Sequence, residues 1–408
     1  MVFRAKAAVN RAHHASHSRP RLLYTATHAM TVRAFLVDQM RYMQSQGFDV
    51  TVACAPDRDL AEQLADAGIG YAPVRMNREM SPAADLFALH RMGQIVRRLR
   101  PDIVNAGTPK AGLLGMLAAR AAHVPVRIYL LRGLRLEGEV GLRRALLAAT
   151  ERLACACAHA VVCVSSSVRD RAVALRLTPP ARCVVLGAGA SNGVDMRRFS
   201  WSEEMCSRAR DLRSRYGIAP DAPVVGFVGR LCRDKGTPDL IHAFVGVRAR
   251  IPRATLVLVG DWENERPARL PPGVVVTGFV EDTAPWYALM DVLAFPSYRE
   301  GLPNVPLEAA AMGVPTAGYE ATGTVDAVGH GEGGTLVPIG DADALARALL
   351  RYLEDPALRR AHGRAARARV ARLFSHEKVW KAWRDEYNRL LARAGSFPGR
   401  GRRAYDAC

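Results

Sequence analysis

The chain has 408 residues, which is too many for one ordinary hydrophobic core and enough for two domains of common size. Hydrophobic residues make up 49% of it, so it can bury sizeable cores and is not disordered as a whole. Its formal net charge of +18 points to anionic partners: nucleic acid, an acidic substrate or an anionic membrane surface. Because no uninterrupted run of about 18 apolar residues occurs, the sequence predicts no membrane-spanning helix.

The two ends of the chain are basic. Residues 1–20 are rich in arginine and histidine but contain no apolar segment, so we expect a disordered tail and not a secretory signal. Residues 395–408 form a second basic tail. The eight cysteines include no CxxC pair, and even the closest two, Cys155 and Cys157, have no histidine cluster beside them. We therefore expect reduced thiols, no zinc site and a cytoplasmic protein.

The amino-terminal half alternates short apolar strands with amphipathic helices. Its predicted strands are Arg21–Thr25, Phe48–Cys54, Pro101–Gly107, Val124–Leu131, Ala160–Ser165 and Arg182–Gly189. Predicted helices include Val32–Gln46 and Asp59–Ala67, the second of which ends at Gly68. This alternation predicts a parallel sheet covered by helices on both faces. We assign residues 21–200 to this first domain.

After a polar segment the same alternation begins again. The second set of predicted strands is Pro223–Arg230, Ala254–Asp261, Val274–Val280, Val292–Ser297 and Val314–Gly318. We assign residues 201–375 to this second domain; the last predicted helix, residues 376–394, can belong to either domain and so can cross back to the first. Two doubly wound α/β domains form a cleft between the carboxyl ends of their strands, where this architecture binds ligands.

The segment "PSYREGLPNVPLEAAAMGVP" places Glu300 and Glu308 on either side of a predicted helix start. Asn304 is a suitable N-cap, and Pro306 is tolerated in the first turn. Free N–H groups at a helix start can bind a pyrophosphate, so Glu308 can accept hydrogen bonds from a ribose and Glu300 from a second sugar. The alternative is structural: Glu308 complements the helix dipole and Glu300 is a solvated loop residue.

The segment "GFVGRLCRDKG" places two basic residues directly after a buried strand. The strand ends at Gly229, and Arg230 and Lys235 follow in the loop before the next helix. A guanidinium grips phosphate oxygens as a fork, and a lysine acts as a point charge, so this loop is typical of phosphate binding. The alternative is an ordinary strand–loop–helix connection with solvated basic residues.

Together, the two segments resemble the GT-B glycosyltransferases of family 4, which are retaining enzymes that use nucleotide sugars. The resemblance extends from about Arg21 to Ala394. It implies two Rossmann-like domains facing a central cleft, with Arg230, Lys235 and Glu300 as the catalytic residues. The donor-binding residues that it implies are Gly229, Phe279, Val280, Gly301, Leu302, Pro303, Asn304 and Glu308. Phe279 and Val280 would line the pocket for the base.

Other segments, "TPKAGLLG" and "SNGVD", resemble enzymes of bacterial capsule, exopolysaccharide and O-antigen assembly. These enzymes typically glycosylate a lipid-linked acceptor, undecaprenyl diphosphate carrying a glycan. The resemblance implies transfer of a hexosyl or N-acetylhexosaminyl group, with UDP as the expected donor nucleotide. Arg132 stands where many relatives have a histidine that supports the donor sugar. His28, Lys110 and Arg132 are the acceptor-side candidates.

The resemblance implies catalysis without a metal or other cofactor, because cationic side chains stabilise the leaving diphosphate and no suitably placed DxD pair is present. Two predicted helices, Asp85–Arg100 and Gly141–Ala158, carry basic residues beside apolar faces. They predict docking on the anionic inner face of the plasma membrane. The alternative is that both are ordinary core helices with solvated arginines.

Three other classes of function are alternatives. A nucleotide-sugar epimerase has the same two-domain architecture, but the paired glutamates argue against it. A nicotinamide oxidoreductase needs a GxGxxG turn after its first strand, and here "TATHAMTV" follows that strand. A nucleic-acid-binding protein would explain the charge but not the glutamate loop, and no nucleic-acid-binding motif is present. We therefore expect no nucleic-acid partner.

Overall fold

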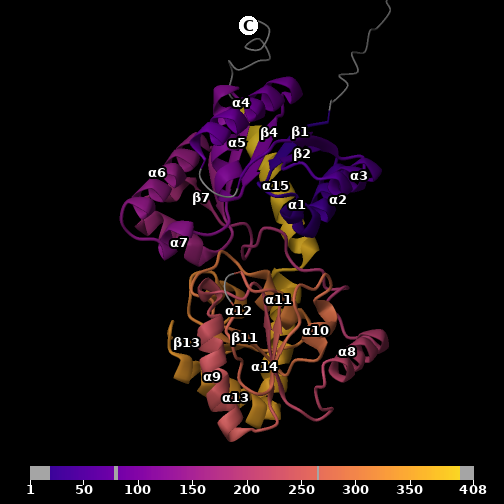
Figure 1. The fold of residues 1–408 in the computed structure, drawn as a ribbon. Coiled ribbons are helices and arrows are strands. Elements are labelled where there is room, and N and C mark those ends of the chain that lie inside the picture. Colours follow the sequence, from indigo (N-terminus) through magenta and orange to yellow (C-terminus); the bar gives the residue numbers. More distant parts are fainter. Residues whose placement is uncertain (1–18, 78–80, 264–265, 396–408) are drawn as a thin grey trace, which may run out of the picture.

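The computed structural model describes residues 19–77, 81–263 and 266–395 and contains two sheets, one in each half of the chain (Figure 1). The tails predicted at residues 1–20 and 395–408 lie outside the described residues, apart from residues 19, 20 and 395. All named strand pairs are parallel, so the predicted fold class, two doubly wound α/β domains, is confirmed. Among the described residues, no helix combines the length and the apolar character needed to cross a bilayer.

The first sheet has seven strands in the order β3-β2-β1-β4-β5-β6-β7. These strands are β1 (Arg21–Thr25), β2 (Asp49–Cys54), β3 (Gly70–Pro73), β4 (Ile103–Gly107), β5 (Val126–Leu131), β6 (Ala160–Cys163) and β7 (Cys183–Val184). The helices are α1 (Ala29–Phe35), α2 (Val37–Ser45), α3 (Arg58–Asp66), α4 (Pro82–Leu99), α5 (Pro109–Ala121), α6 (Gly141–Cys157) and α7 (Ser166–Ala174), with the 3-10 turns η1 (Arg135–Gly138) and η2 (Pro180–Arg182). Helices α4, α5 and α6 pack side by side. Since β1, β4 and β5 are the central strands, the loops that follow them meet at one edge of the sheet.

The second sheet has six strands in the order β10-β9-β8-β11-β12-β13. Its strands are β8 (Val224–Val228), β9 (Thr255–Val259), β10 (Val274–Val276), β11 (Val292–Phe295), β12 (Thr316–Tyr319) and β13 (Gly334–Val337). The helices are α8 (Glu203–Arg215), α9 (Thr237–Arg250), α10 (Ala284–Ala288), α11 (Asn304–Ala311), α12 (Thr324–Val328), α13 (Ala342–Glu354) and α14 (Pro356–Leu373), with a 3-10 turn η3 (Arg233–Lys235). Strands β8 and β11 are adjacent at the centre, so the two sequence segments with charged residues follow neighbouring strands.

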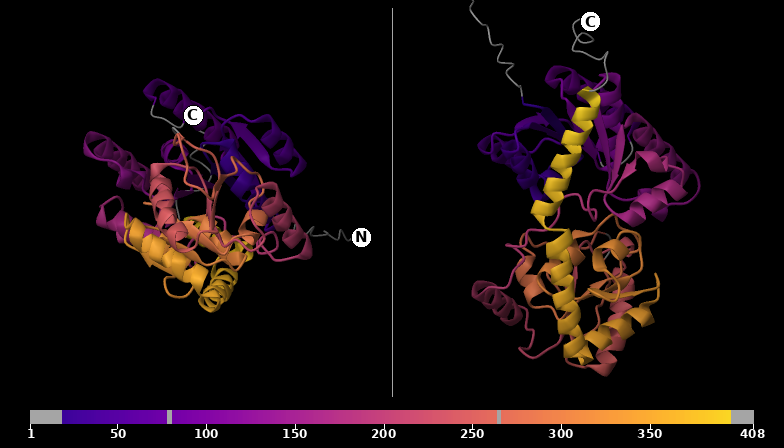
Figure 2. Two further views of the ribbon diagram at one scale, coloured as in Figure 1. Left: turned by 60° about the horizontal axis from the view of Figure 1, so that its bottom comes forward. Right: turned by 180° about the vertical axis from the view of Figure 1, so that it is seen from behind.

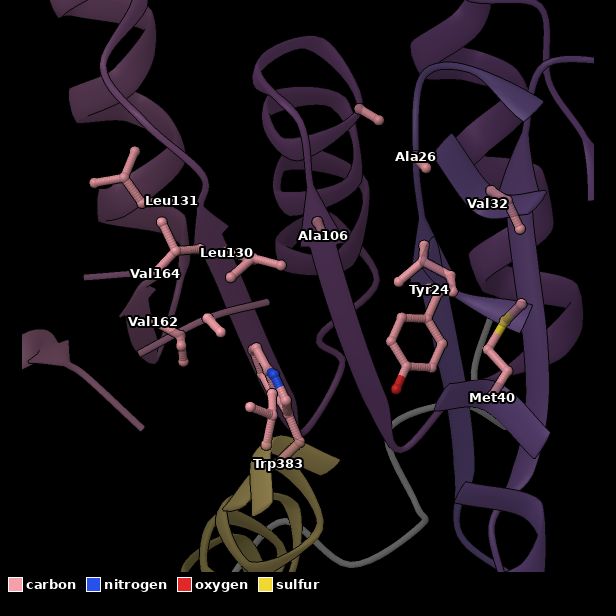
Figure 3. Packing of buried hydrophobic residues seen from close by; sticks show 14 of the residues in the cluster. Tyr24, Ala26, Val32, Met40, Ala106, Leu130, Leu131, Val162, Val164 and Trp383 are labelled. Carbon is pink, nitrogen blue, oxygen red and sulfur yellow. The ribbon is translucent and has the colours of Figure 1, made fainter. Parts of the chain in front are cut away.

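The last helix, α15 (His376–Gly395), leaves the second body and runs along the back of the first (Figure 2). It packs against α2 and β5. Trp383 is buried beside β5 (Figure 3), and its indole N–H donates to the Ser191 carbonyl at 3.1 Å. The two crossings between the bodies lie together, because Val194 N–H donates to Phe374 O at 2.8 Å and His376 N–H donates to Val194 O at 3.0 Å. The bodies are thus joined by a paired connection.

The structure corrects three local predictions. The helix predicted over Val32–Gln46 is two helices that meet at Leu36, because the Asn192 side-chain amide donates to the Phe35 carbonyl and competes with the helical hydrogen bond there. Strands β3 and β13 were not predicted; both are four-residue edge strands, which carry little apolar signal. Of the strand predicted over Arg182–Gly189, only Cys183 and Val184 pair with the sheet.

Candidate active site

A cavity of about 580 Å³ lies between the two bodies, at the carboxyl ends of their central strands. Its residues come from the loops after β1, β4 and β5 in the first body and after β8, β9 and β11 in the second. It brings together seven of the residues predicted from the sequence: His28, Lys110, Arg132, Arg230, Lys235, Glu300 and Gly301. Residues separated by almost 300 positions in the chain therefore share one cleft.

Lys235 and Glu300 form an ion pair in the second body's wall of the cavity. Gly236 follows Lys235 at φ +68°, and a Cβ atom there would lie 2.0 Å from the Pro296 carbonyl, so only glycine lets the two loops approach this closely. The Ser297 hydroxyl donates to the same Glu300 oxygen, Oε1, at 2.6 Å. Within the described residues these contacts all go to Oε1, which leaves Oε2 available to a ligand hydroxyl.

Arg230 is paired with Glu263, a residue that the sequence analysis missed. Glu263 follows the adjacent strand β9, and its position just beyond a strand end was the available signal. A second ion pair joins Arg299 to Asp234 at 2.5 Å and ties the loop after β11 to that after β8. Half of the Arg230 side chain is exposed, 47%, so its guanidinium is reachable by a phosphate in the cleft.

Glu308 is partly buried and lies one turn into α11, outside the lining of the cavity. The Tyr287 hydroxyl donates to its Oε2 at 2.8 Å, and burial raises the pKa of the carboxyl above its ordinary value. The prediction that Asn304 is the N-cap is wrong. Pro303, with extended backbone at φ −72° and ψ 131°, occupies that position, and Asn304 is the first helical residue. Among the described residues, no side chain caps this helix, so its first N–H groups are available to other partners.

Seven of the predicted donor residues do not line the cavity itself: Gly229, Phe279, Val280, Leu302, Pro303, Asn304 and Glu308. Gly229 directly precedes Arg230. A Cβ atom on Gly260 would lie 2.0 Å from the carbonyl oxygen of Gly229, so the loops after β8 and β9 are in close contact there. The next loop pairs through Gly278 with Gly260 and then presents Phe279, which is 71% exposed. The loops after β8, β9 and β10 are thus stacked side by side, with an aromatic ring at their outer end.

The first body's wall contains polar groups of another kind. Lys110, at the start of α5, pairs with Asp85 of α4 at 2.7 Å, and both side chains are largely buried. The Thr27 and Thr108 hydroxyls are 2.7 Å apart, and His28 is the exposed N-cap of α1 without a side-chain capping bond. Arg132 follows β5 and is partly exposed, but desolvation of its guanidinium by the surrounding protein lowers its pKa to about 10. Within the described structure, its Nε has no hydrogen-bond partner.

The two bodies also contact each other directly beside the cavity. Asp326 of α12 accepts hydrogen bonds from the backbone N–H groups of Ser166 at 3.1 Å and Ser167 at 3.3 Å, and from the Ser167 hydroxyl. Ser167 in turn accepts from Gly323 N–H at 2.8 Å. A carboxylate of the second body thus caps α7 of the first, where the helix dipole favours negative charge. The sequence did not predict this contact, although a run of three serines at a helix start contains a capping signal.

A second contact reaches the glutamate loop. The Ser165 hydroxyl donates to the Gly301 carbonyl at 2.8 Å. A Cβ atom on Gly133 would lie 3.3 Å from Gly301, and one on Gly301 would lie 1.8 Å from the Arg132 carbonyl. The backbones at the ends of β5 and β11 therefore touch, and Glu300 sits where the two bodies meet.

Both halves of the chain match families of known proteins. Residues 31–189 match the glycosyl transferase 4-like domain, and residues 222–355 match the glycosyl transferases group 1. The capsular polysaccharide biosynthesis glycosyltransferase CapM of Staphylococcus aureus is 32% identical over 362 residues, covering 86% of this chain and 93% of CapM. The Escherichia coli UDP-Gal:alpha-D-GlcNAc-diphosphoundecaprenol alpha-1,3-galactosyltransferase is 24% identical, covering 80% of this chain and 86% of its own.

Solved structures agree on the fold. The crystal structure of Anabaena HepE in complex with UDP and glucose superposes with a TM-score of 0.74 and 20% identity, covering 91% of this chain and all of HepE. Sucrose-phosphate synthase from Thermosynechococcus elongatus superposes with a TM-score of 0.73 and 19% identity, covering 92% of this chain and all of the synthase. The architecture, the paired charged loops and the match to CapM agree. The chain belongs to the family 4 glycosyltransferases of GT-B fold and is a transferase enzyme.

Proposed function

We propose that this enzyme transfers a hexosyl or N-acetylhexosaminyl group from a UDP-sugar to a lipid-linked glycan on undecaprenyl diphosphate, with retention of anomeric configuration, in bacterial surface-polysaccharide synthesis. The observation that carries the proposal is the Lys235–Glu300 pair, held by Ser297 beside the meeting point of the two bodies. The names of CapM and the E. coli galactosyltransferase support the pathway and the acceptor, and UDP in HepE supports the nucleotide.

The geometry supports an electrostatic mechanism. Breaking the glycosidic bond leaves charge on the diphosphate, and Arg230, Lys235 and the uncapped N–H groups of α11 are placed to stabilise it. The departing phosphate oxygen then takes the proton of the acceptor hydroxyl, which attacks from the same face of the sugar. Glu300 orients the donor sugar through its available oxygen. We propose that these cations do the work that a metal does elsewhere, so that the reaction proceeds in the presence of a chelator.

The donor and acceptor occupy opposite walls in this proposal. The segment between Glu300 and the start of α11 is proposed to contact the donor from its sugar to its diphosphate. It consists of Gly301, Leu302, Pro303 and Asn304. Gly229, Phe279 and Val280 lie towards the base, and Glu308 faces the ribose. His28, Lys110 and Arg132 line the wall from which the acceptor hydroxyl approaches. Contact between the bodies through Asp326 excludes water from this space.

An apolar rim, which we define as Leu86, Phe87, Val140, Leu142 and Leu146, is exposed at the amino-terminal ends of α4 and α6. Leu142 is 87% exposed, so these side chains do not serve the core as ordinary amphipathic helices would. The next residue, Arg143, lines the cavity, so the rim borders the opening of the cleft. We propose that the rim and its neighbouring arginines dock on the anionic inner leaflet, where a lipid-linked acceptor is presented.

The membrane part of the proposal is tested with sedimentation on phosphatidylglycerol vesicles. The double variant Leu142→Asp/Leu146→Asp should lose most of its vesicle binding, whereas Val245→Asp, at an equally exposed position of α9 in the other body, should keep it. Equal binding by both variants would contradict docking through the rim. Random duplex DNA serves as a comparison, since we expect no nucleic-acid partner.

The reaction is tested by incubating the protein, with EDTA, with a panel of UDP- and GDP-sugars and a bacterial lipid extract, and measuring nucleotide diphosphate release. We expect release from one UDP-sugar that depends on the lipid and is lost in Lys235→Ala and Glu300→Ala. Release that continues unchanged in both variants would overturn the assignment of this site. Release that requires added metal would overturn the metal-independent mechanism alone.

A further inference from the structure

The cationic side chains that line the cavity differ in how their charge is balanced. Lys110, Arg143, Arg230, Lys235 and Arg299 each pair with a carboxylate: Asp85, Glu139, Glu263, Glu300 and Asp234, respectively. Arg135 is partly exposed, as Arg132 is, and also has no such partner among the described residues, but it has no nitrogen atom that is both shielded from solvent and without a hydrogen bond. Arg132 has neither a carboxylate partner within the described structure nor a solvated Nε. It is the exception that needs a physical explanation.

Burying the Nε–H group of a guanidinium without a hydrogen-bond partner is unfavourable, because this donor loses its hydration and gains nothing in return. Two observations show that the Nε–H group of Arg132 is in this situation, although the side chain as a whole is only partly buried. Its Nε is shielded from solvent and makes no hydrogen bond to any described residue. Its pKa is lowered, and desolvation is the cause, with no acidic neighbour to offset it. Unfavourable groups of this kind persist in proteins where a ligand uses them.

The surrounding backbone makes room for this side chain. Gly107 ends β4, the strand next to β5, and a Cβ atom there would lie 3.3 Å from Arg132 Nε. Any larger residue at position 107 would press on the guanidinium. On the other side, the Arg132 carbonyl touches Gly301, the residue after Glu300. Arg132 therefore lies at the meeting point of the two walls and opens into the same cavity as Glu300.

We propose that Arg132 binds an anionic group of the substrates, a carboxylate or a phosphate, at a subsite distinct from the one that holds the donor diphosphate. A guanidinium presents its N–H donors as a planar fork that fits either oxyanion. The inference rests on the proposed function, since it assumes that the cavity holds a nucleotide sugar and a glycan acceptor. Two sources are possible for the same chemistry: a hexuronic acid as the transferred sugar, or an acidic group on the acceptor.

Calorimetric titration with UDP, UDP-glucose and UDP-glucuronate separates these sources. If the donor carries the anionic group, the wild-type protein should bind UDP-glucuronate at least tenfold more tightly than UDP-glucose. The Arg132→Met variant should lose that preference and keep its affinity for UDP. If the acceptor carries it, the UDP-bound protein should bind methyl glucuronide or farnesyl diphosphate, and Arg132→Met should weaken that binding at least tenfold. Arg135→Met is the matched control, because Arg135 lines the same cavity but has no shielded nitrogen without a hydrogen bond, and it should change neither.

A second readout does not depend on any ligand. Because Arg132→Met removes a shielded N–H group that has no partner among the described residues, the melting temperature of the free protein should rise. Arg132→Gln, which is shorter and neutral, covers the case in which the methionine variant does not fold. The inference is overturned if every folded Arg132 variant binds all the anionic probes as tightly as the wild type does. It is also overturned if the wild type binds none of these probes more tightly than its affinity for UDP explains. Failure of the wild type to bind UDP at all would instead overturn the proposed function.

Discussion

The two walls of the cleft are built differently. In the second body, the charged groups that face the cavity are matched by neighbours: Lys235 with Glu300 and Ser297, Arg230 with Glu263, and Arg299 with Asp234. In the first body, Lys110 is paired with Asp85 and Arg143 with Glu139, but Arg132 has no partner within the described structure, and His28 is the exposed N-cap of α1. The second body's wall is thus organised before any substrate binds, and we propose that the first body's wall is completed by what binds to it.

This contrast fits a division of labour between the walls. In the proposed function, the nucleoside diphosphate is the constant part of the substrates, and a fixed set of paired charges suits it because little reorganisation is needed during the reaction. The acceptor is the variable part, and a wall with unpaired polar groups can bind it. From this difference we infer that the paired loops hold the donor and that Arg132, whose Nε has no partner among the described residues, contacts the part of the substrates that varies.

The largest expected effect comes from breaking the matched wall. Lys235→Ala should lower kcat by about 10²–10³-fold, because it removes a positive charge from the leaving diphosphate and the partner of Glu300. Nucleotide diphosphate release under saturating donor measures this. Lys381→Ala, an exposed lysine on α15, is the control. A loss of similar size in Lys381→Ala, or none in Lys235→Ala, would break the distinction between the walls.

Glu300→Gln tests whether the carboxylate or only its shape is needed. The amide keeps the size of the side chain but weakens the contacts with Lys235 and with a sugar hydroxyl, so we expect a fall in kcat of about 10–10²-fold. The affinity for UDP alone should change little, because Glu300 is proposed to contact the sugar. Calorimetry with UDP and kinetics with the UDP-sugar, run on one protein preparation, check both statements. A large loss of UDP affinity would contradict this role and indicate that Glu300 contributes to binding the diphosphate.

Asp326 sharpens the comparison because it joins the walls. Asp326→Ala removes the carboxylate that caps α7 across the cleft, so the bodies should separate more readily and kcat/KM should fall about tenfold, as expected for a lost charge-assisted contact. Small-angle scattering should show a larger radius of gyration. Asp343→Ala, an exposed acid in the first turn of α13, should change neither quantity. An unchanged radius with reduced activity would argue that Asp326 acts in another way.

The smallest expected effect concerns a buried pair beneath the first wall. The Tyr129 hydroxyl donates to Glu151 Oε2 at 2.6 Å, and burial raises the pKa of Glu151 from 4.5 to about 7. The folded state therefore binds more protons than the unfolded state between these pH values, and the free energy of unfolding should decrease as pH rises through that window, by about 1–3 kcal/mol. Urea unfolding at pH 5 and pH 8 measures it. Glu151→Gln should flatten the dependence, and an unchanged slope in that variant would show that another group is responsible.

The sequence predicted the donor wall better than the acceptor wall, for physical reasons. Short buried strands leave strong apolar signals, and the loops with Arg230, Lys235 and Glu300 could be placed because they directly follow two such strands. Gly236 and Gly301 in these loops lie where a Cβ atom would meet a backbone carbonyl. Glu263 and Asp326 could not be recognised from the sequence, because the role of each depends on a distant partner. Glu263 pairs with Arg230 on another loop, and Asp326 accepts from Ser166 in the other body. The isolation of Arg132 was equally hidden, since absence of a partner is a property of the folded chain.

The break between α1 and α2 shows the same limit. Local propensity favours one helix over Val32–Gln46, and the interruption comes from Asn192, which lies about 150 residues away along the chain. Sequence patterns thus predicted most of the central strands and the charged loops that follow them. They did not predict contacts that form only when distant segments meet.

Calorimetric titration with UDP on three proteins tests whether the second body's wall binds the donor and the first body's wall the acceptor. We expect the wild type to bind UDP and Lys235→Ala to lose at least tenfold in affinity for UDP. Lys110→Ala, across the cavity, should keep the wild-type affinity. Loss of UDP binding in Lys110→Ala with retention in Lys235→Ala would contradict this assignment of the two walls.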